Sequence, residues 1–131
     1  MREKKFPVEN LHINDSCSVL LIDYIGYRIL LCADIGERGI KMLLSGNGSS
    51  DVDVSADIMQ VPHHGGFIMN TGDLVKSVKP EHAIMSGTAK GISLSTIEDY
   101  QKYGVSLHKT HKNGAVSFTI NKEGIKVSKF L

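Results

Sequence analysis

Short apolar runs, each long enough for one β-strand, recur along the chain. Residues 19–24 (VLLIDY) and 27–33 (YRILLCA) are two such runs, and only Ile25 and Gly26 separate them. A two-residue connection containing glycine between two strand-like runs predicts a β-hairpin. The second run is almost entirely apolar, which indicates a central strand that is covered on both faces.

Helical spacing alternates with further strand-like runs after this hairpin. Ile40, Leu43 and Leu44 are spaced as on one helix face, and Gly46 is expected to end that helix. A second helix is predicted over 72–80, and a third begins with Ser95 as its N-cap and Glu98 three positions later. The remaining strands are expected at 56–61, 82–87, 106–110, 115–121 and 125–130, with a loop at 45–55. This alternation predicts one α/β domain over residues 1–131, with a mixed β-sheet and flanking helices.

Composition and charge narrow the functional classes. The chain has 131 residues, 41% of them hydrophobic, as in a soluble globular domain. Its 15 basic and 14 acidic residues leave a net charge of +1, so any contact with nucleic acid has to be local. No apolar run approaches the roughly 20 residues of a membrane-spanning helix, and the basic N-terminus lacks the apolar segment of a secretory signal. Cys17 and Cys32 have no metal-binding spacing, which favours buried reduced thiols and a cytoplasmic location.

The candidate chemistry lies directly after two of the predicted strands. Asp34 ends the run YRILLCA, and His63 and His64 follow the run ADIMQV within the stretch VPHHGG. If these two strands run side by side, the carboxylate and an imidazole meet at one edge of the sheet. Zinc, manganese and iron accept such ligands. Pro62 restricts the approach to the histidines, and the glycines after them leave room for backbone or substrate.

Each of these residues also has a simpler interpretation. Asp34 and Glu37 have the spacing of a helix capping box, a role that is compatible with metal binding. His63 and His64 are also consistent with turn residues that bond only to the backbone.

The other charged and histidine positions suggest surface roles. An Asn113-Gly114 turn follows Lys109, His111 and Lys112, which predicts a solvated hairpin loop and, as an alternative, a phosphate contact. The four remaining histidines stand among polar neighbours and are expected at the surface: His12, His82, His108 and His111.

The order of these motifs resembles a known family. The stretches NDSCSVLLIDYIGYRILLCADIGERGIKMLL, ADIMQVPHHGG, LVKSVKPEHAIMSG and YGVSLHKTHKNGAVSFTI are similar to the C-terminal half of the metallo-β-lactamase-fold domain in ComEC-type DNA-uptake competence proteins. The resemblance covers roughly residues 14–120. It implies that Asp34 is a metal-bridging aspartate and that His63 or His64 is the last histidine ligand. Asn14 and Asp15 fall where a further ligand motif would lie.

The sequence departs from this family at several positions. The His-x-His-x-Asp-His motif of the N-terminal half is absent, Cys32 and Ala33 replace Thr-Gly before the aspartate, and Gly66 replaces a serine. The segment TAKGISLS also lacks the histidine that the family carries there. The chain therefore offers two or three ligands, fewer than a dinuclear catalytic centre needs. Unless the site is completed, we expect weak binding of zinc or manganese, or none.

The resemblance implies the second half of a metallo-β-lactamase-like αββα sandwich and a metal-dependent hydrolase. A completed site would generate hydroxide for attack on a phosphodiester, which suggests a nuclease acting on DNA. The expected partner is an N-terminal half-domain or a second copy of the chain, because half a sandwich exposes the apolar inner face of its sheet. The alternatives are a non-catalytic remnant that binds a partner and a truncated reading frame.

Overall fold

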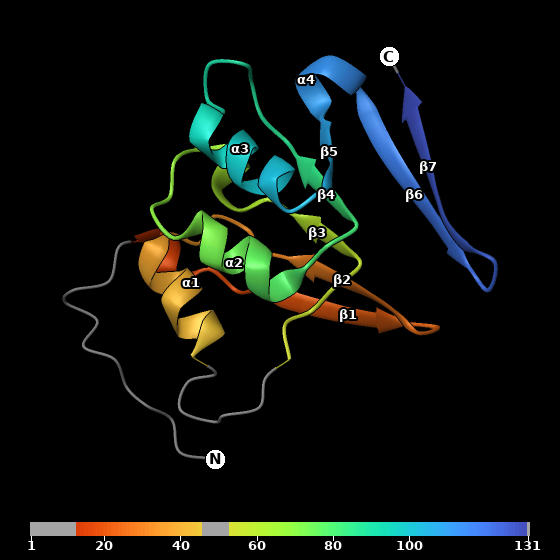
Figure 1. Ribbon diagram of the computed structural model, residues 1–131, viewed down its shortest axis with the longest axis horizontal. Coiled ribbons are helices and arrows are strands. Elements are labelled where there is room, and N and C mark those ends of the chain that lie inside the picture. The colour runs from red at the N-terminus through yellow and green to blue at the C-terminus, as the bar shows by residue number, and fades with distance from the viewer. Residues whose placement is uncertain (1–12, 46–52, 131) are drawn as a thin grey trace.

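A five-stranded mixed sheet organises the protein, whose computed structural model describes residues 13–45 and 53–130 (Figure 1). The strands lie in the order β1-β2-β3-β4-β5. Strand β1 is antiparallel to β2, and the other neighbouring pairs are parallel. Their bounds are β1 Leu20–Tyr24, β2 Tyr27–Leu31, β3 Ile58–Gln60, β4 His82–Met85 and β5 Ser106–Lys109. The predicted α/β class with a mixed sheet is confirmed.

The first hairpin forms as the sequence predicts. Ile25 and Gly26 have φ angles of 45° and 86°, so both central residues of the turn are in the left-handed region that two-residue hairpins require. Tyr24 pairs with Tyr27 directly before and after this turn.

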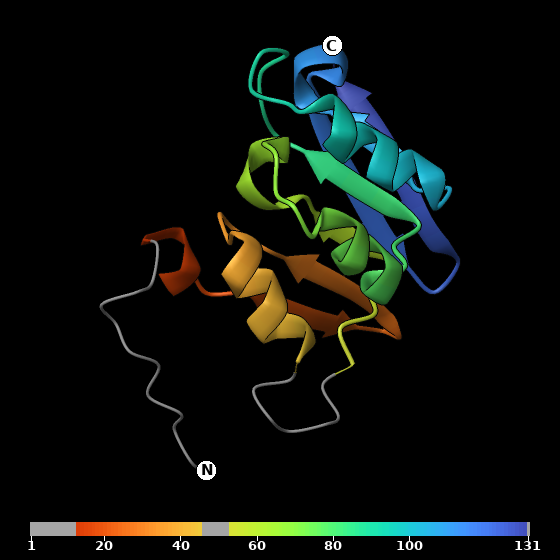
Figure 2. The ribbon, with the colours of Figure 1, turned by 60° about the vertical axis from the view of Figure 1, so that its left-hand side comes forward.

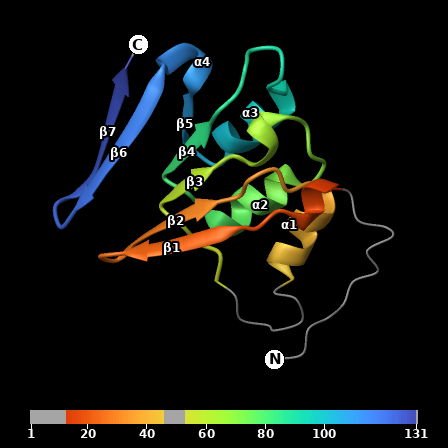
Figure 3. The same ribbon diagram turned by 180° about the vertical axis from the view of Figure 1, so that it is seen from behind.

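Three helices cover one face of the sheet, in front of the strands in Figure 1 and behind them in Figure 3. They are α1 (Glu37–Leu44), α2 (Thr71–Val78) and α3 (Leu94–Lys102). The core between the layers contains Leu30, Met59, Ala83 and Met85 from the strands and Ile40, Leu74, Val75, Val78 and Tyr100 from the helices.

The helix starts differ from the predicted ones. Helix α1 has Gly36 as its N-cap with no side-chain cap, so the predicted capping box of Asp34 and Glu37 does not form. Helix α3 has Ser93, two residues before the predicted Ser95, as its N-cap. The predicted helix end at Gly46 lies outside the described residues.

The face of the sheet opposite the helices is largely uncovered over β1 and β2. Side chains alternate along a strand, so those that neighbour Leu30 in sequence point away from the helix layer. We call this surface the open face and define it as Leu20, Ile22, Tyr24, Ile29 and Leu31. Leu20, Ile22 and Tyr24 are 56%, 42% and 54% exposed. The prediction that the second strand is covered on both faces is therefore wrong, since Ile29 and Leu31 are only half-buried.

A separate hairpin of β6 (Ala115–Asn121) and β7 (Gly124–Phe130) lies beside the β4 and β5 end of the main sheet (Figure 2). A short helix, α4 (Thr110–Asn113), connects β5 to β6. The predicted hairpin loop around Lys109 and Lys112 is wrong, because β5 and β6 belong to different sheets.

Two histidines predicted at the surface lie between the main sheet and this hairpin. Nδ1 of His82 is 3.1 Å from Nε2 of His108, and the Phe118 ring of β6 packs edge-on against both rings. His108 is only 6% exposed, so its predicted surface position is wrong. His111 is exposed as predicted, and His12 lies outside the described residues.

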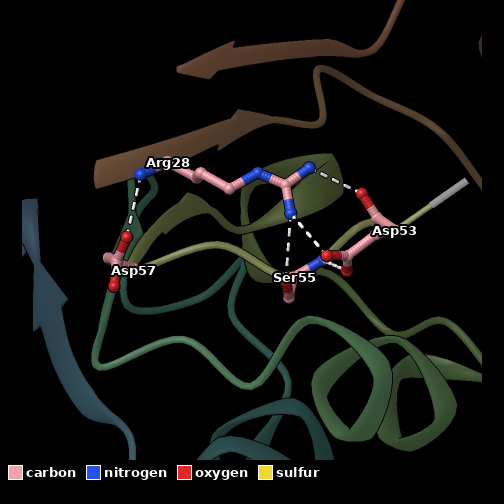
Figure 4. A network of polar contacts seen from close by, with 4 residues as sticks. All are labelled: Arg28, Asp53, Ser55 and Asp57. Carbon is pink, nitrogen blue, oxygen red and sulfur yellow. Dashed lines mark hydrogen bonds and ion pairs between the residues drawn. The ribbon is translucent and has the colours of Figure 1, made fainter. Parts of the chain in front are cut away.

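A polar network ties the segment entering β3 to the beginning of β2 (Figure 4). The Asp57 carboxylate accepts a hydrogen bond of 2.8 Å from the Arg28 N–H, and the Arg28 guanidinium donates to the Asp53 carboxylate and the Ser55 hydroxyl. Hydrogen bonds from Ser55, and after them the Arg28 guanidinium, hold the pKa of Asp53 below its ordinary value. The network fixes the N-terminal edge of the β2–β3 pair, opposite the edge where Asp34 and the histidines lie.

Both cysteines are free thiols, as the sequence predicts, but the predicted burial is wrong for Cys17, which is only half-buried. Cys32 is fully buried, and burial raises the pKa of its thiol to about 12. Within residues 13–45 and 53–130, no helix has the length and apolar character needed to cross a membrane. The cytoplasmic location stays a prediction.

Candidate functional site

The two strands that carry the candidate residues are direct neighbours. Strands β2 and β3 are parallel, and Leu31 at the end of β2 lies opposite Gln60 at the end of β3. The segments that follow β2 and β3 therefore leave the sheet at the same edge. Oδ1 of Asp34 lies 3.3 Å from Nε2 of His64. The predicted meeting of the carboxylate with one of the two imidazoles is thus observed, and His64 is the histidine involved.

The backbone around this pair is unusual for non-glycine residues. Ala33, His63 and His64 have φ angles of 52°, 54° and 55°, in the left-handed region that costs free energy for residues with a Cβ. The N–H of His63 donates to the carbonyl of Ala33 at 3.0 Å, which joins the two strained turns to each other. Such conformations persist only where the surrounding contacts determine them, and they cluster at functional sites.

Surrounding glycines allow the histidine turn to pack closely. A Cβ at Gly66 would lie 2.8 Å from Cδ2 of His63, and a Cβ at Gly65 would lie 2.6 Å from Sδ of Met85. The serine that the resembled family has after His-His-Gly therefore has no room here unless the His63 ring moves.

The contacts of His64 determine which ring nitrogen carries a proton. Its Nδ1 lies 2.7 Å from the carbonyl oxygen of Ser86, and a carbonyl only accepts, so Nδ1 must be the donor. In the neutral ring, Nε2 then has a lone pair that faces the Asp34 carboxylate. Two acceptors 3.3 Å apart repel each other unless a proton or a cation lies between them. A backbone carbonyl that fixes the tautomer in this way is the usual outer partner of a metal-binding histidine.

The spacing of the two acceptor atoms suits a metal ion. Zinc ligands lie about 2.0–2.1 Å from the ion, so two ligands of a tetrahedral site are about 3.3 Å apart. The two side chains are also open to solvent, with 62% of His64 and 45% of Asp34 exposed. Asp34 and His64 therefore fit as two ligands of one ion with its remaining positions toward solvent.

His63 has different surroundings. Its Nδ1 is 3.3 Å from the side-chain amide nitrogen of Asn14, which lies in the short helix η2 (Ile13–Ser16). His63 and Asn14 line a cavity of about 310 Å³ together with Gly36, Glu37, Phe67, Ile68 and Met69. Asn14, which falls where the resembled family has a further ligand motif, thus lies next to the histidine turn. The Asp15 side chain is outside the described part of the chain.

The described residues supply only part of a ligand set. In residues 13–45 and 53–130, no group of three or more His, Cys, Asp or Glu side chains is placed to hold a metal ion. A catalytic zinc site uses three protein ligands. The roles of Asp34, His63 and His64 as catalytic or metal-binding residues stay predictions.

Two residues of the site are missing from the sequence-based candidates. Ser86 contributes its carbonyl, which no side-chain pattern could indicate. Gln60 accepts hydrogen bonds from the N–H groups of Cys32 and Ala33. Its signal was a polar side chain inside the otherwise apolar run IMQV.

Comparison with known proteins gives one distant similarity. The chain is 25% identical to the protein called competence protein ComA from Neisseria gonorrhoeae over 130 residues, which cover 94% of this chain. The chain spans 18% of the length of that relative. No protein-family model matches the sequence, and no solved structure matches the chain.

Proposed function

We propose that this chain contributes part of the metal site of a metal-dependent hydrolase, with Asp34 and His64 as ligands of zinc or manganese. The observation that carries the proposal is the 3.3 Å separation of Oδ1 of Asp34 and Nε2 of His64, with the other nitrogen of His64 held by the Ser86 carbonyl. The tautomer that this carbonyl selects leaves a lone pair beside the carboxylate, which suits a divalent cation.

The fold we propose is the second half of a metallo-β-lactamase-like αββα sandwich. One face of the sheet carries three helices, and the open face presents Leu20, Ile22 and Tyr24 to solvent. A second sheet packed on this face would complete four layers. The missing His-x-His-x-Asp-His motif would come from the same N-terminal half-domain. The length of the relative, of which this chain spans 18%, leaves room for such a half.

The chemistry follows from the donors in the completed site. A divalent ion held by these residues would lower the pKa of a bound water toward neutrality and polarise the phosphoryl oxygen of the substrate. Asp34 would supply negative charge and His64 a neutral lone pair, while the Ser86 carbonyl fixes the orientation of the imidazole ring. Gly66, next to the His63 ring, leaves the approach free of a side chain. Similarity to a competence protein favours a phosphodiester of DNA as the substrate.

Metal titration of the purified chain tests the proposal. We expect calorimetry of the chain alone to show weak binding of Zn²⁺ or Mn²⁺ with one-to-one stoichiometry, because the chain supplies only two ligands. His64→Ala and Asp34→Ala should weaken binding by more than about tenfold, the effect seen when even an outer partner of a ligand is lost. His63→Ala should have a smaller effect, since its Nδ1 faces Asn14. His111→Ala, an exposed histidine on α4, is the matched control.

The second candidate function is a non-catalytic half-domain that binds a partner through the open face. The exposed apolar side chains of β1 favour it. A folded protein that takes up neither metal, or whose uptake is unchanged in His64→Ala, would support this alternative and contradict the metal site.

A further inference from the structure

Beyond the end of strand β2, a side chain of β3 accepts the backbone hydrogen bonds that a neighbouring strand would otherwise accept. The β2–β3 ladder ends where Leu31 pairs with Gln60. The next two N–H groups along the chain, those of Cys32 and Ala33, donate to Oε1 of Gln60 at 3.1 and 3.0 Å. Because both donors face the same atom, the network assigns that atom as the amide oxygen.

This contact restrains the residue directly before Asp34. Ala33 is in the left-handed region, which favours glycine, and its N–H is one of the two donors. Its carbonyl accepts the N–H of His63 at 3.0 Å. The turn that leads to Asp34 is therefore bonded on one side to the last residue of β3 and on the other side to the histidine turn.

The burial of the strand does not account for a glutamine at this position. Met59 and Val61, on either side of Gln60, are almost fully buried, and Gln60 itself is half-buried. Leucine or methionine would continue the apolar pattern of β3 equally well. What glutamine adds is an acceptor oxygen that reaches past the end of the neighbouring strand.

We infer that Gln60 is a positioning residue, which holds the left-handed turn at Ala33 so that the Asp34 carboxylate faces His64. The functional consequence rests on the proposed metal-ligand role of Asp34 and His64. Gln60 accepts hydrogen bonds from the backbone of Cys32 and Ala33, and it acts on Asp34 through that backbone.

Two substitutions separate the acceptor from the shape of the side chain. Gln60→Met keeps the length of an unbranched side chain and removes the oxygen, with Gln60→Leu as a second apolar variant if the first does not fold. Gln60→Glu keeps an oxygen at the same distance from the backbone. We expect Gln60→Met to weaken Zn²⁺ binding about 10–100-fold, as for loss of an outer partner of a ligand, and Gln60→Glu to stay within about threefold of the wild type.

A double-mutant cycle shows whether the effect passes through Asp34. In an Asp34→Asn background the carboxylate is already lost, so Gln60→Met should change Zn²⁺ affinity less than about threefold. An equal loss in both backgrounds would indicate general destabilisation and overturn the inference. Retention of full affinity in Gln60→Met would also overturn it, as would failure of Gln60→Glu to rescue.

A readout without metal separates this inference from the proposed function. The ¹⁵N resonance of His64 Nε2 in the metal-free protein senses the adjacent carboxylate, and Asp34→Asn gives the reference for its absence. We expect Gln60→Met to move this resonance toward the Asp34→Asn position, and Gln60→Glu to leave it near the wild type. If the wild-type chain binds no metal, the proposed function fails while this resonance still decides the role of Gln60. An unchanged resonance in Gln60→Met would refute the positioning role.

Discussion

A single methyl group at Gly87 is expected to disturb the histidine turn. A Cβ at this position would lie 2.6 Å from the carbonyl oxygen of His64 and 3.5 Å from its Cβ. Ordinary contact begins near 3.4 Å, so the two backbones must separate by roughly 0.8 Å, and neither atom of the close contact belongs to a flexible side chain. Gly87 is not in the left-handed region, so alanine suits its backbone and the contact is the main cost.

The expected size of the effect follows from this overlap. Forcing an extra carbon into a packed site costs about 1–3 kcal/mol of unfolding free energy. The same shift moves His64 relative to the Ser86 carbonyl, 2.7 Å from its Nδ1, so we expect Zn²⁺ affinity to fall about 10–100-fold. Urea denaturation monitored by circular dichroism gives the free energy of unfolding, since the chain has no tryptophan for fluorescence. Calorimetric titration gives the Zn²⁺ affinity.

Gly72 in helix α2 provides the matched control. A Cβ there would lie 3.5 Å from Oδ1 of Asp99, which is an ordinary contact. Gly72→Ala should therefore stabilise the protein by up to about 1 kcal/mol through helix propensity and leave Zn²⁺ binding unchanged. A Gly87→Ala protein with wild-type stability and wild-type affinity would refute the packing of the histidine turn against this glycine.

Two further predictions concern the open face and the buried histidine pair. Ile22→Lys should weaken concentration-dependent self-association in sedimentation velocity. Leu94→Lys, a change at an even more exposed apolar residue on α3, should not weaken it, and a monomeric wild type would contradict the prediction. Burial, and after it Lys129 and His82, lower the pKa of His108 below its ordinary value of 6.5. As the pH falls, the unfolded state therefore binds a proton at His108 more readily than the folded state does. The contribution of neutral His108 to folding stability is present above pH 6.5 and is lost as the pH falls through the pKa that His108 has in the folded state. His108→Phe should flatten the fall of Tm below pH 6.5, and an unchanged pH profile would show that another group causes it.

The sequence predicts the strands, turns and helices of this fold better than it predicts which of their side chains are buried. The hairpin at Ile25 and Gly26 follows from local turn chemistry. The meeting of Asp34 with His64 follows from the position of each residue shortly after a strand-like apolar run. Burial was harder to predict. An all-apolar strand indicates that both of its faces avoid water, but the pattern does not show whether this chain or another one covers them. Ile29 and Leu31 are therefore only half-buried in a strand whose sequence predicts full burial.

The errors among polar residues have a common physical cause. Asp34 and Glu37 have capping-box spacing, but Gly36 occupies the N-cap position, which leaves the Asp34 carboxylate outside the helix. His108 has polar neighbours in sequence, yet the β6–β7 hairpin packs Phe118 over its ring. Gln60 hydrogen-bonds the backbone of Cys32, which directly follows β2 and lies 28 residues away in the sequence. Each outcome depends on contacts between segments that a local pattern does not contain.

A single partner would both cover the open face and supply the ligands that Asp34 and His64 lack. The open face ends at Leu31, three residues before Asp34, so the apolar surface and the candidate ligands adjoin at one edge of the sheet. Asp34 and His64 turn 45% and 62% of their side-chain surface to solvent, which is the side from which further ligands have to approach. A partner sheet that covers Leu20 and Ile22 would reach this edge and could place its own histidines beside the pair. Metal binding by the chain alone should then be weak, and burial of the open face should strengthen it, because the same surface contact removes apolar area from water and brings the missing ligands into range.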